Sequence, residues 1–202
     1  MTERRPLWIG ITGGIGSGKS IVCRFFRLLG IPVYSADDRA KWLMANQPEL
    51  KSHLAAIFGK ESYLEDGSVN SPFLAEKVFS DPENLKKINS IVHPAVAVDF
   101  KRWAENQNTP YVIKEAALLF ESGAAKELDA VIHVSSPLKI RKSRVQMRDP
   151  HRSEDQINSI INQQMPDEEK SELADFVIKN NDNKLIIPQI LQIHEVLCSG
   201  LK

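Results

Sequence analysis

Residues 8–26 read WIGITGGIGSGKSIVCRFF, and they carry the strongest structural signal in the chain. The apolar run 7–12 predicts a short buried strand, and four glycines stand among the next six residues. The segment 20–29 carries apolar residues at helical spacing, and 31–34 is apolar again, which predicts a helix and then a second strand. A strand, a glycine loop, a helix and a strand in this order form a βαβ unit with two parallel strands.

The glycine loop contains a phosphate-binding motif. Gly13, four further residues and then Gly18, Lys19 and Ser20 match the pattern G-x-x-x-x-G-K-[ST], the P-loop. Backbone N–H groups of such a loop point at a phosphate, and the following helix adds the positive end of its dipole. Lys19 then adds a charge at the outer phosphates, and Ser20 offers a hydroxyl to Mg²⁺. A flexible turn with a solvated Lys19 is the alternative, but only a P-loop requires the strand before and the helix after.

Composition restricts the class of protein. The chain has 202 residues, enough for one sizeable core with an inserted subdomain, and its 42% hydrophobic and 26% charged residues are ordinary for a soluble protein. Because the net charge is zero, we expect neither nucleic acid nor a membrane as a partner. Cys23 and Cys198 are the two cysteines, and they make no disulfide framework. With no apolar stretch long enough for a signal peptide or a membrane span, we expect a cytoplasmic protein.

The α/β alternation of the opening is interrupted and then resumes. Five short apolar strands are predicted, at 7–12, 31–34, 111–113, 130–134 and 176–178. Helices separate them, among them predicted helices at 138–148 and at 157 to about 164. This alternation argues for a doubly wound parallel sheet. The domain boundaries that follow are a core of 1–37, 107–138 and 171–202, a mostly helical insertion of 38–106 and a lid of 139–170.

Carboxylates follow two of the predicted strands, where a parallel sheet gathers its ligand-binding groups. Asp37 lies just past the second strand, and an alcohol acceptor needs such a group to take its proton. The alternative is that Asp37 or Asp38 is a helix N-cap. Past the third strand, Glu115 holds Mg²⁺ directly or through water, or is a buried carboxylate with backbone partners. Glu121 contacts substrate or is a solvated surface charge.

Two further features bear on the substrates. The run 139–152 carries six Lys or Arg, and Arg141, Arg144 and Arg148 fall on one helical face. They form a positive stripe able to close over a transferring phosphate, or else a solvated basic face. His93, which stands before Pro94, contacts a ligand or caps the end of a helix that Pro94 terminates.

Short segments along nearly the whole chain resemble the dephospho-coenzyme A kinase family, in that family's order. They are GITGGIGSGKS at 10–20, ADDRAK at 36–41, FG at 58–59, HP at 93–94, LLFESG at 118–123, RVQMRD at 144–149 and ADFVIKNN at 174–181. The resemblance implies an α/β P-loop NTPase of the nucleotide-monophosphate-kinase type, with a five-stranded parallel sheet, a helical CoA-binding insertion and a helical lid. It also implies that ATP phosphorylates the ribose 3′-hydroxyl of dephospho-coenzyme A, the last step of coenzyme A synthesis.

Matching motif positions assign roles to residues. Asp37 is then the base, assisted by Lys19, Arg144 and Arg148, and Asn180 lies near the adenine. The phosphates lie on Gly13, Gly14, Gly16, Ser17, Gly18, Lys19, Ser20 and Ile21. Independently of this match, we expect Asp37, His93 and Glu121 to contact the acceptor. We expect Ser20 and Glu115 to hold the metal, Glu115 directly or through water.

The sequence departs from the family pattern at three places outside Lys19, Ser20 and Asp37. Ser35 stands where the family has the first aspartate of D-A-D, Ile21 replaces a threonine, and EAALLFE at 115–121 replaces D-x-P-L-L-F-E.

Other functions on the same fold remain as alternatives. A nucleoside or nucleoside-monophosphate kinase is one, and a non-catalytic regulatory NTP-binding protein is another. A guanine-nucleotide switch would need N-K-x-D, but Asn183-Lys184 is followed by Leu185 and Ile186. For the kinase we expect a monomer or a weak homo-oligomer.

Overall fold

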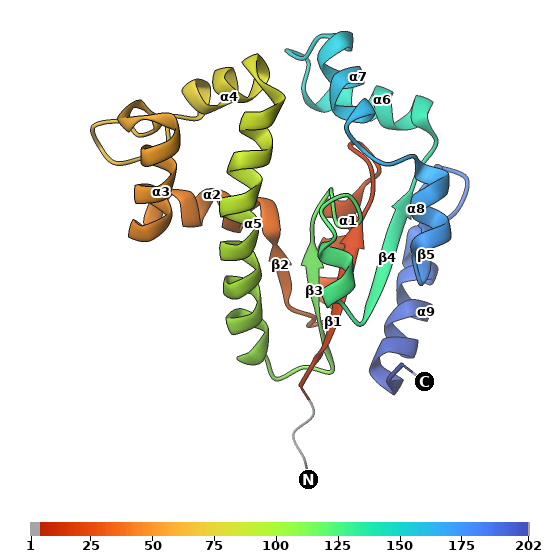
Figure 1. Cartoon of the computed structure of the whole chain (residues 1–202). Coiled ribbons are helices and arrows are strands. Elements are labelled where there is room, and N and C mark those ends of the chain that lie inside the picture. The colour runs from red at the N-terminus through yellow and green to blue at the C-terminus, as the bar shows by residue number, and fades with distance from the viewer. Residues whose placement is uncertain (1–4, 202) are drawn as a thin grey trace. The chain divides into compact units, whose positions relative to one another are not determined.

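The computed structural model describes residues 5–201, apart from the side chains of residues 79, 80 and 82. Its five strands are β1 (Leu7–Thr12), β2 (Val33–Ser35), β3 (Tyr111–Glu115), β4 (Ala130–Ser135) and β5 (Phe176–Lys179). They form one sheet in the order β2-β3-β1-β4-β5 (Figure 1), and β1 pairs in parallel with both β3 and β4. The predicted five-stranded parallel sheet is confirmed.

The strand order places the glycine loop at the centre of the sheet. From β1 the chain moves to one side for β2 and β3, and then to the other side for β4 and β5. Ligands of open parallel sheets bind outside the carboxyl ends of the strands, at the point where the order reverses. In register, Ile11 pairs with Glu115 and Thr12 pairs with His133, so the ends of β3 and β4 flank the start of the loop.

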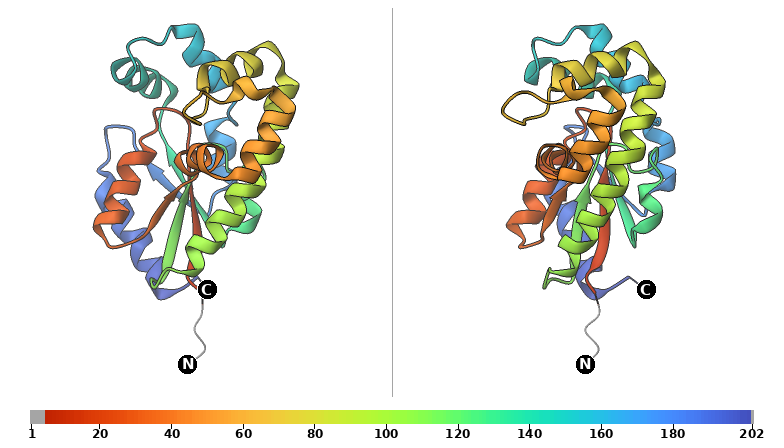
Figure 2. Two further views of the ribbon diagram at one scale, coloured as in Figure 1. Left: turned by 90° about the vertical axis from the view of Figure 1, so that its left-hand side faces the viewer. Right: turned by 60° about the vertical axis from the view of Figure 1, so that its left-hand side comes forward.

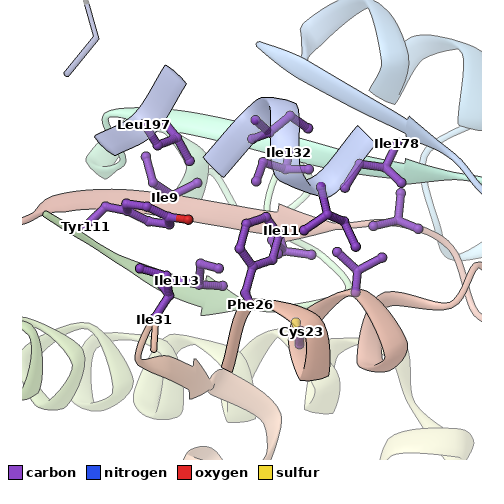
Figure 3. Close-up of a cluster of buried hydrophobic side chains, with 14 of the residues drawn as sticks. Ile9, Ile11, Cys23, Phe26, Ile31, Tyr111, Ile113, Ile132, Ile178 and Leu197 are labelled. Carbon is purple, nitrogen blue, oxygen red and sulfur yellow. The ribbon is translucent and has the colours of Figure 1, made fainter. Parts of the chain in front are cut away.

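One face of the sheet carries the main hydrophobic core. The helices α1 (Lys19–Leu28) and α9 (Ile186–Ser199) lie side by side on it (Figure 2). Alternate strand residues such as Ile11 and Ile132 point towards Phe26 of α1 and Leu197 of α9 (Figure 3). Side chains alternate along a strand, so the residues between them, such as His133, face the other way.

The opposite face is covered in part by α8 (Asp167–Leu173), which packs against β4. The sequence pattern does not predict this helix. Its sequence, DEEKSEL, has no apolar period, and its one fully buried side chain is that of Lys170. A helix of seven residues without an apolar stripe is held by tertiary contacts, which periodicity cannot detect.

Two helices follow β4 and lie beyond its carboxyl end (Figure 1): α6 (Leu138–Arg148) and α7 (Glu154–Asn162). The bounds of α6 are those predicted. The helix α7 begins earlier than the predicted Ile157, because Ser153 and Gln156 form a reciprocal capping box. A short 3₁₀ turn, η2 (Ala124–Glu127), precedes β4.

Residues 35–103 form a second compact unit, described here by itself. It is helical, with α2 (Ala36–Asn46), α3 (Pro48–Phe58), η1 (Lys60–Ser62), α4 (Ser71–Ser80) and most of α5 (Pro82–Glu105). The other unit holds the described residues on either side of it, and α6 and α7 belong to that unit. Among the described residues, no helix is long and apolar enough to cross a membrane.

The predicted helix end at His93-Pro94 is wrong, because α5 continues through Pro94. A proline inside a helix removes one hydrogen bond and costs about 3 kcal/mol. Buried residues at four-residue spacing on both sides of it, Val92, Val96 and Phe100, supply the compensating contacts.

Candidate active site

The N-terminus of α1 is built to receive an anion. Gly18 is its N-cap at φ 97°, a left-handed conformation that favours glycine, and its carbonyl accepts hydrogen bonds from the N–H groups of Ile21 and Val22. Among the residues described here, no side chain caps this end, and the first turn contains no acidic residue. A helix N-terminus without an internal carboxylate binds phosphate readily.

Side chains of the loop supply further donors. Lys19 Nζ donates to the Gly13 carbonyl at 2.7 Å, which holds the ammonium group against the loop. Ser17 Oγ is buried without a hydrogen-bond partner among the described residues. Since buried hydroxyls are normally hydrogen-bonded, this atom fits a loop whose partner is a bound phosphate oxygen. Ser20 lies in the first turn of α1 and is exposed.

Two side chains near the loop, those of Glu115 and Ser20, offer oxygen atoms to Mg²⁺. Glu115 is the last residue of β3. The pKa of the Cys23 thiol in α1 is raised to about 12, mainly because the thiol is buried and secondly because of the negative charge of Glu115. Glu115 therefore lies close to the helix that carries Ser20. No cluster of three or more potential metal ligands occurs among the described residues. Magnesium in phosphate sites binds one or two protein oxygens together with phosphates and water, so this donor set fits it.

Arg144 and Asn180 meet at the loop. Asn180 Nδ2 donates to the Ser17 carbonyl at 2.8 Å, and a side chain at Gly18 would overlap this amide. Arg144 donates to the Asn180 carbonyl at 3.3 Å and to Asp182 Oδ1 at 2.6 Å. Asp182 adopts φ 61° and was not predicted as a site residue, although the surrounding NNDN segment is typical of a turn.

The three arginines predicted on one stripe have different surroundings. Arg141 is 5% exposed, and its Nε donates to the Ile15 carbonyl at 3.2 Å, so it is part of the core and not of a solvent-facing stripe. The Arg148 side chain is 61% exposed and pairs with Asp149 at 2.8 Å. The sequence spacing predicts that all three arginines lie on one face of the helix. Only part of that face of α6 packs on the loop, so Arg141 is buried while Arg148 is exposed.

Glu121 has internal partners. Its Oε1 lies 2.8 Å from Lys170 Nζ and accepts the N–H of Met165 at 2.8 Å. Burial by itself raises the pKa of Glu121, but these hydrogen bonds outweigh it and the pKa is lowered. Glu121 is thus an exposed residue whose carboxylate has internal partners, and contact of Glu121 with substrate stays a prediction.

Asp37 and His93 belong to the unit of residues 35–103. Asp37 is exposed in the first turn of α2, where Ser35 occupies the N-cap position, so the interpretation of Asp37 or Asp38 as the cap is wrong. His93 is exposed within α5 and does not cap a helix end.

A bidentate ion pair, absent from the predictions, joins two helices of the same unit. Arg39 of α2 donates to both carboxylate oxygens of Asp99 of α5 at 2.9 and 2.8 Å. The two residues are sixty positions apart. Arg39 lies in the ADDRAK segment, but nothing in that motif indicates Asp99 as its partner.

Comparisons with known proteins agree with this geometry. A family model described as dephospho-CoA kinase matches residues 7–185. A dephospho-CoA kinase of Bacteroides fragilis is 40% identical over 186 residues, 92% of this chain and 90% of that protein. A solved structure from Thermus thermophilus has a TM-score of 0.81 and 32% identity, covering 98% of this chain and all of that one. The dephospho-CoA kinase of Campylobacter jejuni has a TM-score of 0.68 and 26% identity, over 96% of this chain and 98% of that one.

The P-loop between β1 and α1 lies at the reversal of strand order, and both the family model and the relatives extend far beyond that loop. The chain therefore belongs to the dephospho-CoA kinase family.

Proposed function

We propose that the protein transfers the γ-phosphoryl group of ATP to the ribose 3′-hydroxyl of dephospho-CoA, giving coenzyme A and ADP. Family membership, which extends over residues 7–185, is the observation that carries the acceptor. The uncapped N-terminus of α1, directly after a glycine loop at the centre of the sheet, supports the nucleotide.

Asp37 is our choice for the general base. It would accept the proton of the 3′-hydroxyl as that oxygen bonds to the γ-phosphorus, while the bond from phosphorus to the β–γ bridging oxygen breaks and ADP leaves. Its place just past β2 and its exposure in the first turn of α2 support this role, because a base must reach solvent-delivered substrate.

Charge on the transferring group needs cations. Lys19 lies in the loop itself, Arg144 lies beside it, and the exposed Arg148 is one helical turn farther along α6. When bound, Mg²⁺ would supply positive charge that offsets the charge of the outer phosphates. Ser20 and Glu115 would hold it, either directly or through water.

The larger organisation follows the family. We assign acceptor binding to the helical insertion 38–106 with His93, and closure over the nucleotide to the lid 139–170. Glu121 joins the acceptor-binding residues in this assignment. We further propose a cytoplasmic enzyme, a monomer or a weak homo-oligomer, with ATP and dephospho-CoA as its partners and with no nucleic acid or membrane.

The test is ADP release from Mg-ATP with dephospho-CoA, AMP, CMP, UMP, adenosine or no acceptor. Turnover confined to dephospho-CoA, with one phosphate added at the 3′ position by mass spectrometry, is the expected result. Turnover with a monophosphate would show that the acceptor is wrong. An absence of acceptor-dependent turnover would contradict the kinase assignment altogether.

A further inference from the structure

The backbone of the P-loop is held at Ile15 by two side chains from outside the loop. Arg141 Nε, from α6, donates to the Ile15 carbonyl at 3.2 Å. On the other side, the Ile15 N–H donates to Gln164 Oε1 at 2.9 Å, and Gln164 lies between α7 and α8. The N–H and the carbonyl of Ile15 are therefore hydrogen-bonded to two residues near opposite ends of the predicted lid, 139–170.

These two bonds orient more than Ile15, because each peptide group is planar. The Ile15 carbonyl shares its plane with the Gly16 N–H, so Arg141 directs that N–H to the opposite side, away from α6. The Ile15 N–H shares its plane with the Gly14 carbonyl, which itself accepts the N–H of Ser17 at 3.1 Å. The orientation of two consecutive peptide groups of the loop, Gly14–Ile15 and Ile15–Gly16, thus depends on two external side chains.

Glycines of the motif make room for this arrangement. A side chain at Gly14 would overlap the guanidinium of Arg141, and one at Gly16 would overlap the backbone of the same residue. Gly16 also has φ 80°. Gly14 and Gly16, which the sequence motif assigns to phosphate binding, are therefore also the positions at which α6 packs on the loop.

Arg141 is itself fixed by a partly buried carboxylate, that of Asp167. Its Nη1 donates to Asp167 Oδ1 at 3.2 Å, at the start of α8. Asp167 accepts Ser135 Oγ at 2.6 Å and lies 3.3 Å from His133 Nε2, both residues of β4. A guanidinium that is 5% exposed needs such a partner, since an unpaired buried charge is strongly destabilising.

We propose that Arg141 and Gln164 are positioning residues for the phosphate-binding loop, and that Asp167 orients Arg141. This deepens the proposed function, on which it rests, and assigns Arg141 a role through backbone geometry in place of direct contact with phosphate. The two bonds hold the Gly16 N–H towards the phosphates before the nucleotide arrives, which lowers the cost of ordering the loop on binding.

The test compares Gln164→Ala, Arg141→Lys and the double variant with Gln163→Ala, an exposed neighbour of the same type. Binding of ATP alone is measured by calorimetry, together with kcat, both KM values and the melting temperature. Each single variant is expected to weaken ATP about tenfold or more, with the KM for dephospho-CoA within about twofold. The double variant is expected to be no weaker than about the worse single variant, because both bonds set one loop conformation.

Two results would overturn the proposal. Unchanged ATP affinity with a lowered melting temperature would make both residues purely structural. Wild-type affinity in Arg141→Lys would show that charge matters and bond geometry does not, because lysine keeps the charge but lacks Nε. Gln164→Ala removes a half-exposed polar side chain, so it keeps the test valid if Arg141→Lys fails to fold. Calorimetry needs no acceptor, so failure of the proposed function would appear separately, as an absence of turnover in the wild type.

Discussion

Lys170 Nζ lies 2.8 Å from Glu121 Oε1, and the Lys170 side chain has no exposed surface. Lys170 Nζ also donates to the Ala117 carbonyl at 3.3 Å, which itself accepts Thr12 Oγ1. The pair therefore ties α8 to the segment after β3 and to the end of β1. In EAALLFE, the glutamate that the family pattern shares thus has a structural partner 49 positions later.

Glu121→Gln should destabilise the protein by about 3 kcal/mol, because it leaves the Lys170 charge buried without its counter-charge. In a chain of this length this lowers the melting temperature by roughly 2–4 °C per kcal/mol. The double variant Glu121→Gln with Lys170→Met should recover much of the loss, and Glu168→Gln on the exposed side of α8 is the control. An unchanged melting temperature with a raised KM for dephospho-CoA would instead favour the substrate role.

Asp37→Asn should lower kcat about 10²–10⁴-fold, because the acceptor hydroxyl loses its base. Affinity for ATP and the melting temperature should stay near wild type, since Asp37 is exposed and caps no helix. Steady-state kinetics with dephospho-CoA measure this, and Asp38→Asn is the matched control in the same turn. If Asp37→Asn turns over normally, Asp37 is not the base.

Ser20→Ala should raise the Mg²⁺ concentration that gives half-maximal rate, by about tenfold, while the fold is retained. Ser20 is exposed at the start of α1, so loss of its hydroxyl leaves no cavity. Titration of the rate with Mg²⁺ at fixed ATP checks this, with Ser143→Ala on α6 as the control. An unchanged titration curve would remove Ser20 from the metal ligands.

Asp167 should make stability depend on acid pH. Burial by itself raises its pKa, but His133, Ser135 and Arg141 outweigh burial and lower it from the ordinary 3.8. A carboxylate whose pKa is lower in the folded than in the unfolded protein stabilises the fold at pH values above its pKa in the unfolded protein. This contribution is lost as the pH falls through its pKa in the folded protein.

Urea unfolding at pH 7 and near pH 3 checks this prediction. Asp167→Asn should be less stable than the wild type at pH 7, and the difference should shrink as the pH falls below 3.8. Glu168→Gln, at an exposed neighbour, should show no such convergence. A difference that is constant across this range would mean that the charge of Asp167 does not stabilise the fold.

Features that depend on short-range chemistry can be predicted from the amino-acid sequence. Residues 8–26 specify a strand, a glycine loop and a helix, since each is encoded by neighbours within a few positions. The bounds of β1 and α6 agree with the predictions for the same reason. The ordered motifs from Gly13 to Asn180 indicated the family, and the family model matches residues 7–185.

Features that join distant parts of the chain could not be predicted from the sequence, because they depend on tertiary packing. The helix α8 lacks an apolar period, and α5 passes through Pro94, because packing outweighs the local preference in both cases. Arg141 donates a hydrogen bond to the Ile15 carbonyl, 126 positions away in the sequence. Its side chain is therefore buried against the loop, although the sequence pattern places it on a basic stripe. A sequence pattern reports which face of an element is apolar, but the partner of a buried charge is set by which elements the sheet brings together.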